Sequence, residues 1–124
     1  MNPGGQLERR KSYAVFRATG ETTLEDAVAA VTSAIVSARE QSIKNLLVDI
    51  VGLVGFEPPT HGERYLFVTE WANASQGLVR MALIVERRMI DPRKYGVSVA
   101  HSLGFAGNVF VTENAAIEWL LSAE

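Results

Sequence analysis

Cysteine is absent from the 124-residue sequence, histidine occurs only twice, and neither sign of charge is in large excess. The absence of cysteine excludes disulfides, thiolate chemistry and cysteine-based zinc or iron–sulfur sites. Neither His61 nor His101 is followed four residues later by a histidine or a carboxylate, so no metal site is predicted. A net charge of −2 gives no bulk electrostatic support for nucleic-acid binding, and no nucleic-acid partner is expected.

Long apolar runs are also missing. The longest strongly apolar stretch, residues 45–56, is too short to cross a bilayer and contains Asp49, so no membrane insertion is expected. The N-terminus lacks the pattern of a signal peptide, and we therefore expect a cytoplasmic protein. The length indicates a single domain over residues 6–124, preceded by a flexible segment at residues 1–5 with two glycines and a proline.

Hydrophobic spacing predicts strands that alternate with helices. The expected strands are residues 6–10, 13–19 (ending at Gly20), 45–51, 78–85 and 108–111. The expected helices are residues 24–38, 59–74, 92–103 and 113–122. The first two strands form an antiparallel hairpin, and the later apolar ones are typical of strands covered on both faces. This order predicts an α/β sandwich with a mostly parallel sheet of about five strands and about four helices.

Two helix starts carry capping signals. Thr22 and Glu25 have the spacing of a capping box for the first helix. Asp91 would cap the third helix, with Pro92 at its first position, where the missing amide costs nothing. Gly104 predicts the end of that helix in a left-handed conformation.

The most unusual stretch is the loop GLVGFEPPTHGER, residues 52–64, which follows an expected buried strand. Ligands of open α/β sheets bind outside the carboxyl ends of the strands. The start of the next helix also offers free amides to an anion. The candidate binding residues are Glu57, Pro58, Pro59, Thr60, His61, Arg64 and Tyr65. The alternative is a stiff loop that only fixes the entrance to the helix, with Gly52 and Gly55 forming a tight turn.

The next helix carries Tyr65, Phe67, Val68 and Trp71, which are too widely spread for one narrow apolar stripe. One side of this aromatic helix would then stay uncovered in a monomer. An exposed apolar face predicts a dimer contact or an apolar ligand. Core packing alone is the alternative.

Residues 46–63, LLVDIVGLVGFEPPTHGE, resemble the central segment of the STAS-like, SpoIIAA-like fold. That fold is found in anti-sigma-factor antagonists and in the cytoplasmic domains of sulfate transporters. The resemblance extends over nearly the whole chain, through the segments TGETTLE, MIDPRKYG and NVFVTENAAIEWL. The sequence resembles the small stand-alone bacterial members of this family. The resemblance implies a SpoIIAA/STAS-like sandwich and a regulatory role through protein binding.

The phosphoryl switch of the anti-sigma-factor antagonists does not transfer to this sequence. Their phosphorylatable serine lies in an Asp-Ser-Ser-Gly loop at the start of the corresponding helix. The resemblance places Glu57 at the aspartate and Pro58-Pro59 at the two serines. Proline has no hydroxyl group, so phosphorylation at these positions is excluded. Thr60 is the only nearby hydroxyl, and a shifted phosphorylation site there is a hypothesis.

Three functions remain open. The first is a non-enzymatic STAS-like module that binds a protein partner, or a second copy of itself as a homodimer, through the loop and helix around residues 57–64. The second is a binder of a small apolar or lipid-like molecule, in a pocket between the aromatic helix and the sheet. The third is an enzyme using Glu57, His61 and Arg64, for which no set of nucleophile, base and oxyanion donor can be assembled. No cofactor is predicted.

Overall fold

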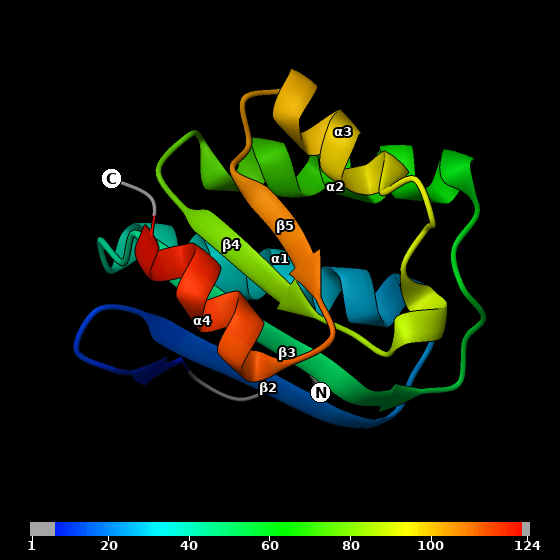
Figure 1. Ribbon diagram of the computed structural model, residues 1–124, viewed down its shortest axis with the longest axis horizontal. Coiled ribbons are helices and arrows are strands. Elements are labelled where there is room, and N and C mark those ends of the chain that lie inside the picture. The colour runs from blue at the N-terminus through cyan, green and yellow to red at the C-terminus, as the bar shows by residue number, and fades with distance from the viewer. Residues whose placement is uncertain (1–6, 123–124) are drawn as a thin grey trace.

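The computed structural model describes residues 7–122, so the segment expected to be flexible, residues 1–5, lies outside the described residues (Figure 1). The strands are β1 (Glu8–Arg9), β2 (Ala14–Glu21), β3 (Asn45–Val54), β4 (Arg80–Ile84) and β5 (Gly107–Phe110). The helices are α1 (Leu24–Glu40), α2 (His61–Ser75), α3 (Tyr95–Ser102) and α4 (Glu113–Ser122), with a short 3₁₀ helix η1 (Arg87–Met89). The predicted α/β class is confirmed.

The strands form one five-stranded sheet in the order β1-β2-β3-β4-β5. β1 is antiparallel to β2, whereas β2, β3, β4 and β5 are parallel to one another. This arrangement confirms both the antiparallel start and the mostly parallel sheet. The parallel order places the carboxyl ends of β3, β4 and β5 along one edge of the sheet, where ligand sites of such sheets form.

Helices cover both faces of the sheet (Figure 1). α1, α2 and α3 pack on one face, around a core that includes Ile35, Leu46 and Val48. α4 packs on the other face, where Leu47 and Leu120 are buried together. Neighbouring residues of β3 therefore belong to different cores, because successive side chains of a strand point to opposite faces. Among residues 7–122, no helix is both long enough and apolar enough to cross a bilayer.

β2 continues past the point where the sequence predicts its end. Gly20 was expected to stop this strand, and this prediction is wrong. Gly20 and Glu21 pair with Leu53 and Val54 at the far end of β3. The long partner strand supplies hydrogen bonds beyond the glycine, and these bonds keep the backbone extended.

The glycines of the next loop have different roles. Gly52 was expected in a turn, but it lies inside β3 opposite Thr19. A Cβ atom at Gly52 would come within 2.6 Å of the Thr19 Cγ2 atom, so glycine permits close contact between the strands here. Gly55 does form the turn, with φ +108°.

The capping of α1 also differs from the prediction. The N-cap is Thr23, whose hydroxyl accepts a hydrogen bond from the Asp26 amide at 3.1 Å. The Thr22 amide instead donates to the Val54 carbonyl at 2.8 Å. Thr22 is therefore still held by β3 when the helix begins, and the predicted Thr22–Glu25 capping box is not formed.

α3 starts later than its sequence predicts. Pro92 was expected at the first helical position, but the helix begins at Tyr95. The Asp91 carboxylate accepts hydrogen bonds from the amides of Arg93 and Tyr95, so it caps a turn that precedes the helix. The predicted end is confirmed, because Gly104 follows the helix with φ +76°.

Candidate ligand-binding site

A cavity of about 120 Å³ lies between α1, α2, α3 and the face of the sheet that these helices cover. Its wall is mostly apolar, and it includes Val31, Ile50, Phe67, Trp71, Met81 and Ala100. The cavity extends to residues that follow the carboxyl ends of β3 and β4. This is the position at which parallel α/β sheets bind their ligands.

Several of the residues around the cavity are small. Ala27 of α1, Gly96 and Ala100 of α3 and Gly107 of β5 all line the cavity. None of them has a side chain that reaches across the gap between the helices and the sheet. Protein interiors are otherwise close-packed, with few voids larger than a water molecule, so a cavity of this size is a specific feature.

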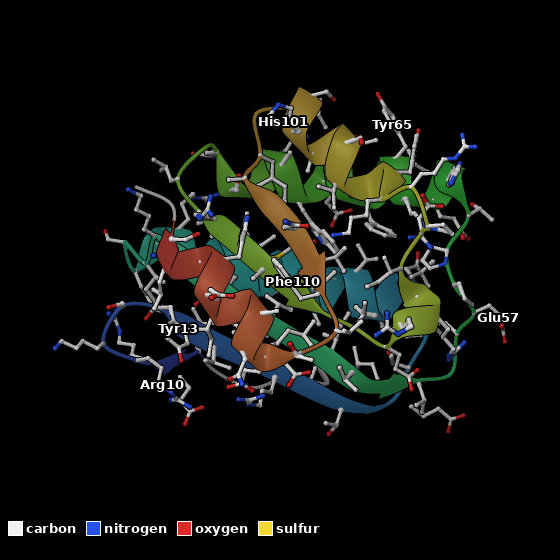
Figure 2. All side chains as sticks on the ribbon, in the orientation of Figure 1. Arg10, Tyr13, Glu57, Tyr65, His101 and Phe110 are labelled. Atoms are coloured by element: carbon white, nitrogen blue, oxygen red, sulfur yellow. The ribbon has the colours of Figure 1, made fainter. Side chains whose placement is uncertain are left out.

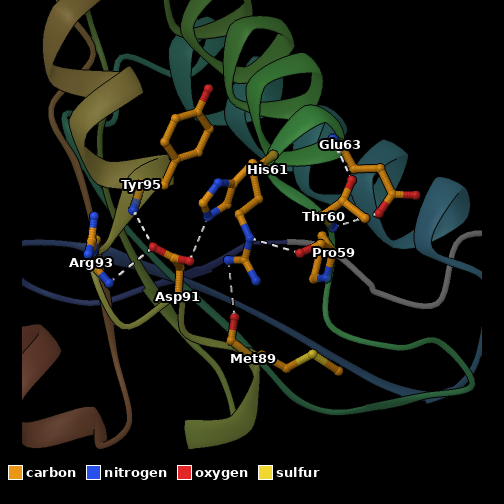
Figure 3. A network of polar contacts seen from close by, with 9 residues as sticks. Pro59, Thr60, His61, Glu63, Met89, Asp91, Arg93 and Tyr95 are labelled. Atoms are coloured by element: carbon orange, nitrogen blue, oxygen red, sulfur yellow. Dashed lines mark hydrogen bonds and ion pairs between the residues drawn. The ribbon is translucent and has the colours of Figure 1, made fainter.

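Polar contacts join the start of α2 to the segment between η1 and α3 at one side of the cavity (Figure 3). The Arg64 Nε donates to the Pro59 carbonyl at 3.0 Å, and its Nη1 donates to the Met89 carbonyl at 3.3 Å. The His61 Nε2 lies 2.8 Å from the Asp91 Oδ1. Pro59, Arg64, Met89 and Asp91 also line the cavity, although His61 does not. This network therefore forms part of the rim of the cavity.

Asp91 is the centre of this network. Its Oδ1 contacts His61, while its Oδ2 accepts from two backbone amides, including that of Tyr95. The His61 ring also stacks on Tyr95, with 4.5 Å between ring centroids. The hydrogen bond from His61, followed by that from the Tyr95 amide, holds the pKa of Asp91 below its ordinary value of 3.8. These contacts fasten the start of α2 to the start of α3.

The lowered pKa of Asp91 predicts a loss of stability in acid. A carboxyl group whose pKa is lower in the folded state stabilises that state above its unfolded pKa, and the contribution disappears as the pH falls through the folded pKa. We therefore expect Asp91→Asn to lower the urea midpoint at about pH 5 and to have a smaller effect as the pH falls towards about 2. Glu57→Gln, which changes an exposed carboxylate of the loop between β3 and α2, is the matched control and should show no such trend. An Asp91→Asn effect that stays constant between the two pH values would contradict the assignment.

The structure brings some of the predicted binding residues to the cavity. Pro59 and Arg64 line it, and His61 is joined to its rim through Asp91. Thr60 is the N-cap of α2, and its hydroxyl accepts from the Glu63 amide at 3.1 Å while the Glu63 carboxylate accepts from the Thr60 amide. The Thr60 hydroxyl thus takes part in a capping box.

The other predicted residues do not line the cavity. Glu57 and Tyr65 project outward from the molecule, as Figure 2 shows, and Pro58 is exposed. His101 lies on α3 and is also exposed (Figure 2). Within residues 7–122, no group of three or more histidine or acidic side chains is placed to hold a metal ion. The binding features therefore gather at Pro59, His61 and Arg64.

The segment before α3 also contributes to the cavity, and the sequence did not predict this. Met89, Ile90, Asp91 and Lys94 line the cavity, although only capping was expected of Asp91. One signal was present in the sequence. Met89 and Ile90 are an apolar pair within the charged run ERRMIDPRK, and such a pair is typical of a loop that covers a core.

No protein-family model and no curated protein matches the sequence. Two solved structures are similar over most of the chain. The first is an anti-sigma factor antagonist from Mycobacterium paratuberculosis, with a TM-score of 0.59 and 13% identity over 92% of this chain and 90% of that one. The second is an uncharacterised protein with a SpoIIAA-like fold from Shewanella loihica PV-4, with a TM-score of 0.50 and 22% identity over 94% of this chain and 91% of that one.

At these identities, both similarities concern the fold alone. The resemblance noted in the sequence is therefore confirmed for the fold. The chain has the SpoIIAA-like, STAS-like fold.

Proposed function

We propose that the protein binds a small apolar molecule in the cavity between α1, α2, α3 and the sheet. The observation that carries this proposal is the cavity itself, which is apolar and lies at the carboxyl ends of parallel strands. Atoms that line an empty apolar void lack dispersion contacts on one side. An apolar ligand would supply these contacts.

The volume of the cavity indicates the size of the ligand. An engineered apolar cavity of about 150 Å³ takes up benzene or xenon. At about 120 Å³ the present cavity is somewhat smaller. A buried body of about six carbon atoms is therefore the expected size.

Benzene is a suitable first probe, because the chain contains an internal reporter and an internal control. Of its two tryptophans, Trp71 lines the cavity, whereas Trp119 packs beside Phe110 on the α4 face. We expect benzene to shift the indole N–H resonance of Trp71 in a nitrogen–proton correlation spectrum and to leave that of Trp119 unchanged. Shifts of both resonances, or of neither, would contradict the proposal.

Two variants on α3 make this test specific to the cavity. Val97 is half-buried and lines the cavity, so Val97→Phe should fill it and abolish the benzene-induced shift. Ser98, the next residue, is exposed and does not line the cavity, so Ser98→Phe should bind benzene normally. Native mass spectrometry of protein purified from cells should also show a co-purifying small molecule that Val97→Phe loses and Ser98→Phe retains.

The proposed role is binding without catalysis. Glu57 is exposed and lies outside the cavity lining, and Arg64 is engaged with two backbone carbonyls. His61 is paired with Asp91. These side chains are thus not gathered around one point at which a substrate bond could be attacked, which favours binding over the enzymatic alternative.

A second proposal is a protein partner, or a second copy of the chain, on the outer surface of α2 and the loop before it. Tyr65 and Leu66 support it, because they are 49% and 70% exposed in this helix. The preceding Pro58 and Pro59 stiffen the loop, which lowers the cost of ordering it on binding. The neighbour from M. paratuberculosis is an anti-sigma factor antagonist, which also favours a protein partner. Light scattering tests self-association, since a monomer at high protein concentration would contradict the homodimer.

A further inference from the structure

Two cationic side chains at the rim of the cavity, Arg64 and Lys94, have no carboxylate partner among residues 7–122. Arg64 is half-buried, and within the described part of the chain it donates only to the carbonyls of Pro59 and Met89. A guanidinium group has five N–H donors, so further donors remain for a ligand. The two carbonyls accept hydrogen bonds but do not neutralise the positive charge, which is costly beside an apolar wall.

The carboxylates at the same rim are already engaged. Asp91 contacts His61 and two backbone amides. The Glu86 Oε1 lies 3.2 Å from the Arg88 Nε, with which it forms an ion pair. Among the residues that the structure describes, neither carboxylate forms an ion pair with Arg64 or Lys94, so both cations remain open to an anionic ligand.

Lys94 adds a second positive charge from the opposite segment. It stands directly before α3 with φ +51°, a conformation that its backbone holds through a hydrogen bond from its amide to the Asp91 carbonyl at 2.8 Å. The residue is exposed overall, yet it contributes to the cavity lining. A long lysine side chain of this kind packs its carbon stem on apolar surface and keeps the ammonium group in water.

We propose that the ligand of the cavity is a small carboxylate: an apolar body of about six carbon atoms inside the cavity, with its anionic group held at the rim by Arg64 and Lys94. This inference rests on the proposed function. Arginine is suited to the role because its planar N–H donors match the two oxygens of a carboxylate. A carboxylate at the rim would form ion pairs with these two cations while the body remains in the apolar space.

Hexanoate and hexan-1-ol are a matched pair of probes, since both are six-carbon chains and they differ in charge at neutral pH. The readout is the indole N–H resonance of Trp71, with Trp119 as the internal control. We expect hexanoate to bind about tenfold more tightly than hexan-1-ol, the size of effect typical of a hydrogen bond to a charged group. Arg64→Gln should reduce the affinity for hexanoate about tenfold and leave the affinity for hexan-1-ol unchanged.

Arg93→Gln is the control for a general effect of charge. Arg93 is an exposed cation of the same segment that does not line the cavity, and its loss should leave both affinities unchanged. Because Arg64 also bridges two loops, Arg64→Gln could perturb folding, and Lys94→Gln is then the deciding variant. Lys94→Gln should also weaken the binding of hexanoate selectively.

The outcomes separate the two proposals. Equal affinities for hexanoate and hexan-1-ol in the wild-type protein would overturn the assignment of an anionic ligand, while the proposed apolar site would stand. The same holds if Arg64→Gln and Lys94→Gln both fold and bind hexanoate as the wild type does. If benzene and both six-carbon probes leave Trp71 unchanged, the proposed function itself is wrong.

Discussion

Leu47→Ala is expected to lower the free energy of unfolding by about 2–5 kcal/mol. Leu47 is fully buried near the start of β3, in the core that β3 and its neighbours form with Leu120 of α4. The substitution loses the free energy that is gained when these methyl groups move from water into the core, and it leaves a cavity behind. Because α4 alone covers this face, no second helix can move in to close the hole. Urea denaturation measures the change, which is a large fraction of the roughly 5–15 kcal/mol that stabilise a typical domain.

A matched control lies on the helix that covers Leu47. Leu121 of α4 is 42% exposed, and Leu121→Ala should change the free energy of unfolding by no more than about 0.5 kcal/mol. The cavity on the opposite face should be unaffected, so benzene should still shift the resonance of Trp71 in folded Leu47→Ala protein. A loss below about 1 kcal/mol for Leu47→Ala would contradict the assignment of this residue to the centre of a core.

The central strand could be predicted from the sequence because its pattern depends on local composition. A strand covered on both faces has no solvent side, so its residues are almost all apolar, as Leu46 and Leu47 are. These two residues do point into different cores. The strand ends could not be predicted in the same way. Whether Gly20 and Gly52 belong to strands depends on how far β2 and β3 pair with each other, and the sequence near each glycine does not contain this information.

Part of the candidate site could also be predicted from the sequence. Pro59 and Arg64 follow the end of a parallel strand, and a general rule of topology places ligands there. Their partners come from far along the chain, since Met89 is 25 residues from Arg64 and Asp91 is 30 residues from His61. Only the packing of α3 beside α2 brings these segments together. The cavity is harder still to foresee, because small residues such as Ala100 leave a space only when three helices and the sheet have taken their positions.

Trp71→Ala is expected to lower the free energy of unfolding by about 3–5 kcal/mol and to enlarge the cavity. Trp71 is 5% exposed, and its ring centroid lies 4.7 Å from that of Phe67. Its Nε1 donates to the Val28 carbonyl at 3.3 Å, so the substitution also leaves this carbonyl without its indole donor. Since Trp71 already lines the cavity, the space left by the indole joins the existing one. Thermal or urea denaturation measures the loss.

The enlarged cavity provides a second measurement, because a ligand that binds only the folded state raises its stability. Naphthalene is larger than the six-carbon body for which the wild-type cavity has room, and we expect it to raise the Tm of Trp71→Ala but not that of the wild-type protein. Trp119→Ala is the control, since it removes the same side chain from the α4 face, where Trp119 packs against Arg80. It should be destabilised without gaining any response to naphthalene. An equal rise in Tm for both variants would show that naphthalene binds elsewhere. No rise in Tm for Trp71→Ala would show that the space left by the indole collapses and does not add to a ligand cavity.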